Sequence, residues 1–441
     1  MATTGHYFYN RTSLGEEGEI MAETLIGKSV GRIEGVAKAT GRALYPADIS
    51  FPGMLYGKAK RIPVASARLV RVDVAPALKI PGVVAALTAR DVPGHNGHGV
   101  LIPHMPVLAG ERVRSVNDVV AVVAAEDEAT AEEACRAIEV EYEPLPAVFD
   151  PLEAMKPGAP LIHGDSNILY HIKIRRGDVE AGRRASAVIV SNTYRTPMLD
   201  HAFLQPEAAV ARVDERGHIE IHVATQYPHW DRTEVARSLG VPQDRVRIVT
   251  STVGGAFGGR EDMTLQILAA LLASHTRRPV KMINSREESF YSHSKRHPMI
   301  MKYTTGADRE GRLTFVEAEI VGDSGAYASW SPNVLRKAAV HATGPYYVPN
   351  VKIDAYAVYT NNPFTGAMRG FGATQPPIAY EGQMDLLAAE LGIHPFTIRW
   401  RNILRQGSVT ATGQVLERSV GLEACLLAAA MAAGWDVEKL K

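Results

Sequence analysis

Two glycine-rich turns constrain what this chain can fold into more than any other feature of its sequence. They read GGAFGGRE at residues 254–261 and GAMRGFG at residues 366–372, and each precedes a segment whose pattern predicts a helix. Glycine lacks a side chain, so the main-chain N–H groups of such turns can approach a ligand closely. A helix N-terminus that follows would add unpaired donors and a partial positive charge. The turns therefore predict a site for an anionic cofactor or an oxo group.

Neither turn fits the common phosphate-binding loops. The first lacks the Gly-Lys-Ser/Thr ending of a nucleoside triphosphate loop, and neither has the spacing of the dinucleotide fingerprint. Taken singly, each could be a tight turn that needs a positive φ. Both turns, however, carry a phenylalanine and an arginine among their glycines, and such side chains in a turn favour ligand contact. Together the turns predict one shared ligand site.

The composition excludes several classes of protein. Of the 441 residues 46% are hydrophobic, which is enough for two or three domains with cores. The 48 basic and 48 acidic residues balance, so the charge excess typical of nucleic-acid-binding or anionic-membrane-binding proteins is absent. No apolar stretch approaches the ~20 residues that cross a bilayer, and the N-terminus lacks the order of a signal peptide. We therefore expect no membrane span and a cytoplasmic location.

The two cysteines, Cys135 and Cys425, cannot form a disulfide framework or a four-thiolate iron–sulfur cluster. We expect both of them in the core. The histidines are scattered without metal-ligand spacing, so each is expected to be structural.

The hydrophobic pattern predicts an α+β fold in two domains. Residues 1–24 are interpreted as an N-terminal arm without regular structure. A first domain at 25–150 has predicted strands at 83–87, 119–124 and 139–142 and a helix at 126–138. Five prolines between 144 and 160 predict an irregular linker at 151–165. A second domain then covers 166–441.

Strands and helices recur through the second domain. Strands are expected at 187–191, 219–224, 246–250, 280–283, 313–321 and 351–360. Helices are expected at 231–239, 263–275, 378–391 and 422–433. The second of these is apolar on almost every side and should be buried, and Gly392 should end the third.

The motifs resemble those of a known family. The two turns are similar to the cofactor loops of the molybdenum hydroxylases, the xanthine dehydrogenase and aldehyde oxidoreductase family. Other similar motifs follow in family order, and the likeness covers residues 25–435: GR at 31–32, KATG at 38–41, YPAD at 45–48, ATQ at 224–226, SKRHP at 294–298, GDSGAY at 322–327 and YTNNP at 359–363. The resemblance implies an α/β hammerhead domain at 25–150, followed by the first half of a molybdopterin-binding region at 166–441.

The resemblance also implies roles for individual residues. The molybdopterin cofactor would be bound by Gln226, Gly255, Ala256, Phe257, Gly258, Gly259, Arg260, Ala367, Met368, Arg369 and Gly370. Gln226 would hydrogen-bond an oxo ligand of molybdenum, while Phe257 and Arg369 would lie beside the metal without coordinating it. Donors fixed around an oxo group would stabilise charge as the metal cycles.

Three residues would face the substrate: Glu261, Lys337 and Phe371, the last stacked on a planar ring. Glu261 could instead complement the dipole of the helix predicted after the first turn. Lys337, beside Arg336, stands where many purine-oxidising relatives have an arginine, and lysine is a point charge rather than a planar fork. It could bind a substrate carboxylate or be a solvated helix charge.

Two further positions depart from the family pattern. Gln205 stands where close relatives carry a glutamate. The second loop lacks the cysteine of the carbon monoxide dehydrogenases, which argues against carbon monoxide oxidation.

The resemblance implies that an N-heteroaromatic acid such as nicotinate is hydroxylated with oxygen from water, with molybdenum-molybdopterin cytosine dinucleotide as the cofactor. The chain ends at Lys441, earlier than most molybdenum polypeptides of the family. We therefore expect a second molybdenum-binding subunit that carries the general-base glutamate, and no catalytic base in this chain. A FAD subunit and a [2Fe–2S] subunit would carry the electrons away.

Other interpretations stay open at this point. The substrate could be a purine or an aldehyde. The chain could be a non-catalytic carrier of the pterin, or part of a reducing enzyme that dehydroxylates an aromatic thioester.

Overall fold

The computed structural model describes residues 26–441, so the arm predicted at 1–24 lies outside the described residues. The chain divides into two units after Ala43. The described part of the first unit holds one short helix, α1 (Gly35–Ala39). The second unit, from Leu44 to Lys441, contains all the strands of the described chain.

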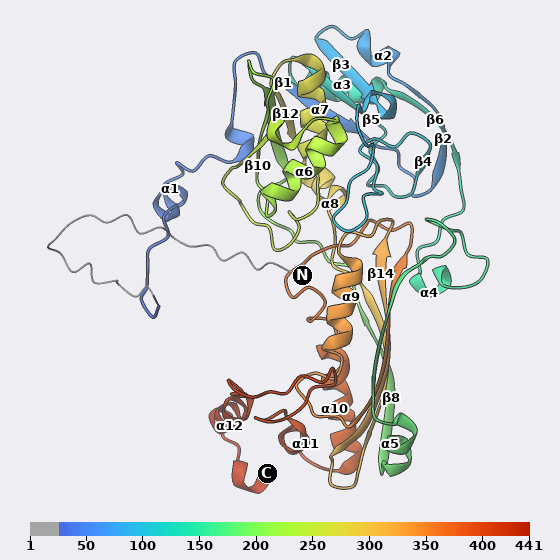
Figure 1. Ribbon diagram of the computed structural model, residues 1–441, viewed down its shortest axis with the longest axis vertical. Helices are drawn as coiled ribbons and strands as arrows, with labels where there is room; N and C mark the ends of the chain where they lie inside the picture. Colours follow the sequence, from blue (N-terminus) through green and yellow to red (C-terminus); the bar gives the residue numbers. More distant parts are fainter. Residues whose placement is uncertain (1–25) are drawn as a thin grey trace, which may run out of the picture. The chain divides into compact units, whose positions relative to one another are not determined.

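A seven-stranded sheet forms one half of the second unit (Figure 1). In spatial order its strands are β11 (Val246–Thr250), β10 (Ile219–Val223), β9 (Ala208–Val213), β12 (Val280–Ile283), β1 (Leu55–Lys60), β5 (Ala121–Ala125) and β3 (Val83–Thr88). β1 pairs in parallel with β12, with Leu55 opposite Val280. The sheet therefore contains strands from both sides of the predicted linker at 151–165.

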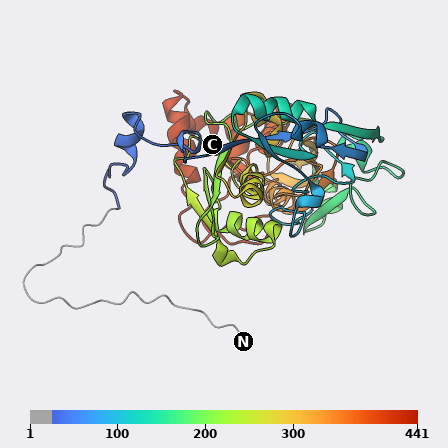
Figure 2. The ribbon, with the colours of Figure 1, turned by 90° about the horizontal axis from the view of Figure 1, so that it is seen from above.

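Helices cover both faces of this sheet. α6 (Pro228–Leu239) and α7 (Gln266–Thr276) pack on one face, and α3 (Glu128–Ala137) packs on the other. Figure 2 shows α3 in teal and α6 in yellow-green on opposite sides of the strands. The alternation along β5 explains this arrangement, because Val122 joins the core under α7 whereas Val123 joins the core under α3. Residues 266–273 of α7 are all buried, as its apolar sequence predicts.

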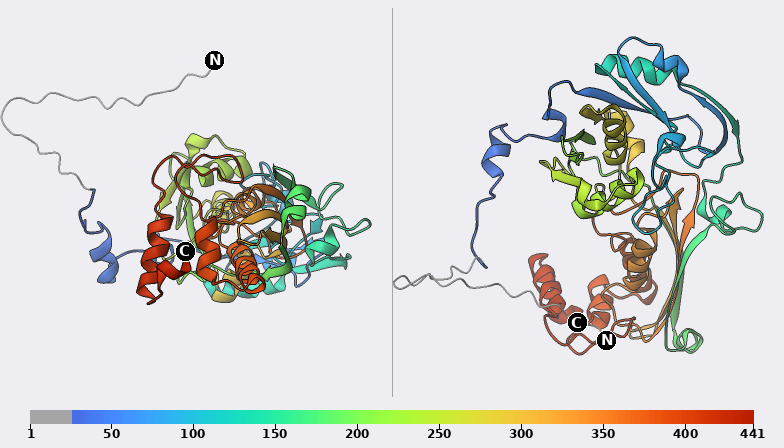
Figure 3. Two further views of the ribbon diagram at one scale, coloured as in Figure 1. Left: turned by 90° about the horizontal axis from the view of Figure 1, so that it is seen from below. Right: turned by 45° about the horizontal axis from the view of Figure 1, so that its top comes forward.

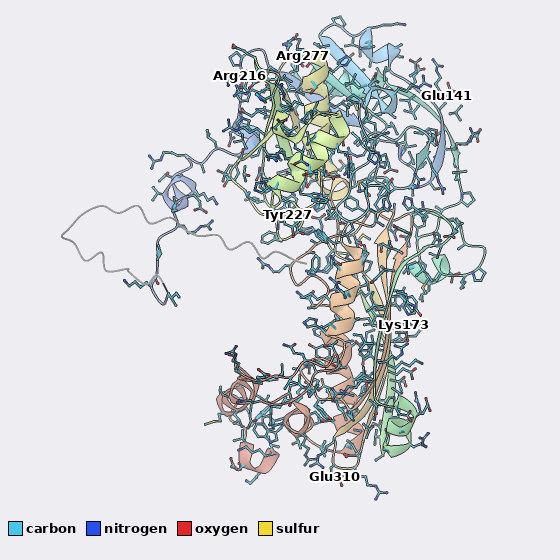
Figure 4. The ribbon with its side chains drawn as sticks, viewed as in Figure 1. Glu141, Lys173, Arg216, Tyr227, Arg277 and Glu310 are labelled. Carbon is cyan, nitrogen blue, oxygen red and sulfur yellow. The ribbon has the colours of Figure 1, made fainter. Side chains whose placement is uncertain are left out.

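A five-stranded sheet forms the other half. Its order is β7 (Ile168–Arg176), β15 (Asn350–Tyr359), β14 (Leu313–Gly325), β13 (Met299–Ala307) and β8 (Val188–Thr196). α9 (Ser331–Val340) and α10 (Pro377–Leu391) cover one face of it (Figure 3). Gly392 ends α10 in the left-handed conformation, as predicted. Figure 4 labels Glu310 at the hairpin between β13 and β14.

The remaining elements are smaller. β4 (Arg112–Val113), β2 (Ala67–Asp73) and β6 (Glu139–Pro144) form a third sheet. The other helices are α2 (Ala75–Leu78), α4 (Pro151–Ala154), α5 (Val179–Ala185), α8 (Arg286–Ser292), α11 (Pro395–Asn402), α12 (Leu422–Ala432) and α13 (Val437–Leu440). None of the helices in 26–441 combines the length and the apolar composition that a bilayer span requires.

Several expectations need correction. The linker at 151–165 is not wholly irregular, because Pro151 begins α4 at the position where a missing N–H costs nothing, and Asp150 caps the helix by accepting from the N–H of Leu152 at 2.7 Å. The elements that were not predicted include strands β1, β2, β4, β7, β9 and β13 and helices α2, α5, α8, α9 and α11. Cys425 is exposed on α12 rather than in the core, and Cys135 is half-buried.

Candidate cofactor and substrate site

The two glycine-rich turns meet. The segments that carry them are here called loop 1 (residues 251–265, between β11 and α7) and loop 2 (residues 360–376, between β15 and α10). The N–H of Arg369 donates to the carbonyl oxygen of Phe257 at 2.8 Å. A Cβ atom on Gly258 would lie 2.5 Å from the carbonyl oxygen of Ala367. Only glycine permits this approach, so the structure brings the two turns into one site.

The helices do not begin directly after the turns. α7 begins at Gln266 and α10 begins at Pro377, each a few residues beyond its turn. The expected donors from a following helix N-terminus are therefore not part of the turns. For the same reason Glu261 is not a first-turn charge, because α7 has no acidic residue in its first turn. That alternative for Glu261 is wrong.

The loop backbone supplies donors of its own. Within residues 26–441, the partly or fully exposed loop residues whose main-chain N–H groups have no hydrogen-bond partner include Gly255, Ala256, Phe257, Met368 and Gly370. The guanidinium of Arg369 is exposed beside them, 4.9 Å from the centre of the Phe257 ring. Clustered amides and a guanidinium are the groups that bind phosphate and oxo oxygens. The donor set therefore fits the oxo and phosphate groups of a molybdopterin cofactor.

Gln226 braces loop 1. It lies between β10 and α6, and its Oε1 accepts from the N–H of Gly258 at 3.0 Å and from that of Arg260 at 3.4 Å. Its Nε2 lies 3.4 Å from Oε1 of Glu261. The side chain is exposed. Gln226, which the sequence predicts to contact an oxo ligand, thus lies against loop 1, and its side-chain amide nitrogen lies toward Glu261.

Arg260 holds loop 1 from behind. Its side chain is buried, its Nε donates to the carbonyl oxygen of Gly255 at 2.8 Å, and its Nη2 donates to that of Gln205 at 2.6 Å. Burial lowers the pKa of Arg260 to about 10, so it stays charged at neutral pH. Gly259 is buried in the same layer, and Ala367 is buried in loop 2. These three predicted cofactor residues form the floor of the site rather than its surface.

The substrate candidates Glu261 and Phe371 lie in an aromatic cluster. The ring of Phe371 stands edge-on to Trp330 with centroids 5.8 Å apart, and Trp330 stands edge-on to Tyr227 at 6.2 Å. Burial raises the pKa of the Glu261 carboxyl, and the neighbouring side chain of Tyr227 opposes the shift. Figure 4 labels Tyr227 at the start of α6. Sequence reasoning missed Tyr227 and Trp330, although Tyr227 directly follows the ATQ motif.

Lys337 lies on α9, on the same side of the helix as Trp330. Trp330 is the N-cap of α9, and seven positions correspond to two helical turns, or about 10 Å along the axis. Lys337 is exposed, and within the described chain its ammonium makes no hydrogen bond or ion pair. Lys337 is therefore a free cation two turns from the aromatic cluster.

A buried charge network lies beneath the loops. His293 is fully buried between Asp200, at 3.3 Å, and Glu207, at 2.9 Å. Burial alone would lower the pKa of His293, but its close contacts with these two carboxylates raise it. Lys295 pairs with Asp200 at 2.8 Å. None of these residues was predicted as part of the site.

Comparison with known proteins gives the family. The molybdopterin cofactor-binding domain matches residues 162–403, and the a/b hammerhead domain of aldehyde oxidase and xanthine dehydrogenase matches residues 40–146. The large molybdopterin subunit of nicotinate dehydrogenase from Eubacterium barkeri is 46% identical over 90% of this chain and 94% of its own length.

Two other relatives are longer. The xanthine dehydrogenase molybdenum-binding subunit of Escherichia coli O157:H7 is 33% identical over 90% of this chain and 54% of its own length. Quinoline 2-oxidoreductase from Pseudomonas putida 86 superposes with a TM-score of 0.87 at 30% identity, over 93% of this chain and 54% of its own. The chain thus spans about half of these two proteins. It belongs to the aldehyde oxidase and xanthine dehydrogenase family of molybdenum hydroxylases, as a subunit with a molybdopterin cofactor-binding domain.

Proposed function

We propose that this chain binds molybdenum-molybdopterin cytosine dinucleotide in a multi-subunit hydroxylase of a nicotinate-like N-heteroaromatic substrate. When bound, the molybdenum centre supplies the oxidising power and activates water as the source of oxygen. The observation that carries the proposal is the meeting of loops 1 and 2, both of which have main-chain donors that are left free within the described residues.

The residues of this chain would bind and orient the molybdopterin cofactor. The free N–H groups of Gly255, Ala256 and Phe257 in loop 1, and those of Met368 and Gly370 in loop 2, would hold oxygen atoms of the cofactor. Gln226 would donate from Nε2, which lies on the Glu261 side of loop 1. Groups fixed before the ligand arrives need no reorganisation during turnover, which is why they are effective in catalysis.

The aromatic cluster supports a planar substrate. Phe371 and Trp330 present ring faces and edges within 6 Å of each other, an arrangement that suits a flat aromatic guest. Burial raises the pKa of the Glu261 carboxyl, which in its protonated form would donate a hydrogen bond to a ring nitrogen. Lys337 is the free cation that a carboxylate on such a ring would pair with. The combination favours an aromatic acid over an aldehyde.

The partners follow from what this chain lacks. Cys135 lies half-buried on α3 and Cys425 is exposed on α12, and two thiols cannot hold a [2Fe–2S] cluster. Electrons would therefore leave through a [2Fe–2S] subunit and a FAD subunit. The general-base glutamate would come from a second molybdenum-binding subunit.

The test is purification of the chain with the proteins that its own host assembles with it. We expect molybdenum, iron and flavin in one complex, cytosine nucleotide after cofactor hydrolysis, and hydroxylation of nicotinate that takes ¹⁸O from labelled water. Xanthine and benzaldehyde are the comparison substrates. A complex that binds molybdenum but oxidises only xanthine or benzaldehyde would overturn the substrate assignment. A molybdenum-containing chain with no turnover in any complex would support a carrier instead.

A further inference from the structure

A third segment lies behind both loops. Residues 200–207 lie in the connection between β8 and β9, and Oε1 of Gln205 accepts from the N–H of Gly254 at 2.7 Å. The ring of Phe203 lies under loop 1, since a Cβ atom on Gly255 would be 2.7 Å from the Phe203 Cβ. The Arg260 guanidinium covers the same ring at 4.3 Å. This segment therefore supports loop 1 from the interior.

His201, in the same segment, contacts both loops. Its Nε2 lies 2.8 Å from the carbonyl oxygen of Ala367 in loop 2. Its ring also packs against Gly259 in loop 1, where an added Cβ atom would lie 3.0 Å from Cγ and Nδ1. The side chain is buried. One imidazole thus joins two loops that are remote in sequence.

The protonation state of His201 is fixed by its surroundings. Burial lowers its pKa to about 4, with a further lowering by the charge of His293, although the bond to Ala367 opposes the shift. Because Nε2 faces a carbonyl oxygen, the neutral ring must carry its proton on Nε2 and donate it. Within the described chain Nδ1 has no hydrogen-bond partner, so it is left as a bare acceptor.

The turn that carries His201 has a constrained backbone. Ala202 has φ of 48°, which a residue other than glycine rarely adopts, and its N–H donates to Oδ1 of Asp200 at 2.7 Å. Asp200 in turn pairs with His293 and Lys295. The main chain of Lys295 also holds loop 2, because its carbonyl oxygen accepts from the N–H of Gly366 at 2.9 Å. His201 is therefore linked to loop 2 by a second route, which runs from Asp200 through Lys295 to Gly366.

We propose that His201 is a positioning residue that fixes loop 2 against loop 1, so that the free N–H groups of both loops face one ligand. The inference rests on the proposed function only where it names that ligand as molybdopterin. The ring does not touch the ligand in this role, because its two contacts are with the loop backbone. Its donor sets the position of Ala367, and its ring sets the position of Gly259.

The test compares His201→Phe with His201→Gln in the isolated complex. Phenylalanine keeps a ring against Gly259 but loses the donor, whereas glutamine keeps a donor. Hydrogen exchange at the N–H of Arg369, which bonds to Phe257, reports the contact between the loops directly. We expect about tenfold faster exchange in His201→Phe, equivalent to about 1.4 kcal/mol, and a several-fold lower molybdenum content. His201→Gln should restore most of both.

Tyr303→Phe is the matched control. It deletes another buried side-chain bond to a main-chain carbonyl, from the Tyr303 hydroxyl to Ala342 at 3.1 Å in the core under α9 and α10. It should leave the exchange at Arg369 unchanged. Unchanged exchange in His201→Phe would overturn the proposal, as would an equal change in Tyr303→Phe. If His201→Phe does not assemble, His201→Leu is measured in the same way. If the wild-type complex contains no molybdenum, the proposed function is refuted. The hydrogen exchange at Arg369 in His201→Phe would still decide the role of His201.

Discussion

Arg369 and Phe257 are joined twice across the two loops. The N–H of Arg369 donates to the Phe257 carbonyl at 2.8 Å, and its guanidinium stands 4.9 Å from the centre of the Phe257 ring. Phe257 has φ of 52°, in the left-handed region, and its side chain is 43% exposed. A bulky residue holds such a backbone only when its surroundings fix it. The loops are therefore fastened at the exposed surface by this pair and in the interior by His201.

Gly258 is the position where loop contact leaves no room for a side chain. In Gly258→Ala the new methyl group would meet the main chain of Ala367, and the φ of 106° would be strained as well. We expect the loops to separate and the molybdenum content to fall at least about tenfold, since a shift of 1.4 kcal/mol in binding is tenfold. Elemental analysis of the purified complex measures the loss.

Gly413→Ala separates backbone strain from loop contact. Gly413 has φ of 91° but no atom within 4 Å of an added Cβ. It should therefore lose stability while keeping its molybdenum. Equal molybdenum in the Gly258→Ala and wild-type complexes would show that loop contact does not hold the cofactor.

Gln226 is expected to matter more for turnover than for stability. Gln226→Leu leaves the N–H of the buried Gly258 without its side-chain acceptor, and the loss of one such hydrogen bond should cost about 1 kcal/mol. Loss of a donor fixed beside a reacting centre typically costs about a hundredfold in kcat. Steady-state kinetics and urea unfolding together measure the two effects.

The control for Gln226 is Gln243→Leu, which removes an exposed glutamine that accepts a single bond from Arg232. It should change neither quantity. Turnover by Gln226→Leu at the wild-type rate would contradict the oxo-contact role.

Lys337 is expected to recognise a carboxylate on the substrate. In Lys337→Ala the KM for nicotinate should rise about tenfold, the equivalent of one charge-assisted contact of about 1.4 kcal/mol. The KM for nicotinamide, which carries no charge, should change little. Arg336→Ala is the adjacent control, because Arg336 is equally exposed on α9. Parallel increases for both substrates would mean that Lys337 acts on the fold of α9 instead.

The sequence could predict elements whose pattern is local. β5 lies in the valine-rich run VVAVVA at 119–124, β11 reads VRIVT, and α7 is apolar on almost every side, so each was recognised. β9 reads AAVARV, and alanine has low strand propensity, so its place in the sheet depends on its pairing with β10 and β12. The pairing of β1 with β12 is non-local and leaves no periodic signal.

The residues of the site also divide into those that a local pattern predicts and those that depend on tertiary contacts. The glycine-rich loops were found because their constraint is local, in that a Cβ atom has no room there. His201 and Trp330 have no such signature. Their positions depend on tertiary contacts, with Ala367 for His201 and with Phe371 and Tyr227 for Trp330. Arg260 and Gly259 are buried beneath the exposed surface of the site, and no sequence motif reveals this burial.

The buried carboxyl of Asp262 should make the folded chain less stable as the pH rises. It follows Glu261 in loop 1, and both of its carboxylate oxygens lie within 2.9 Å of the Ser329 hydroxyl. Burial raises its pKa to about 6, although the hydrogen bond from Ser329 opposes the shift. The folded chain therefore binds a proton that the unfolded chain, with a pKa near 3.8, has already released. The contribution of Asp262 to stability is present below pH 4 and is lost as the pH rises through 6.

The loss amounts to about 3 kcal/mol for a shift of about two pKa units. Asp262→Asn cannot ionise, and its amide still accepts from Ser329, so this variant should lack that decline between pH 4 and 7. Urea unfolding of the wild-type and Asp262→Asn complexes across this range measures the difference. Thr264→Val, a substitution in the same loop that removes no charge, should follow the wild-type profile. A wild-type profile in Asp262→Asn would show that the Asp262 carboxyl is already ionised without cost in the folded chain.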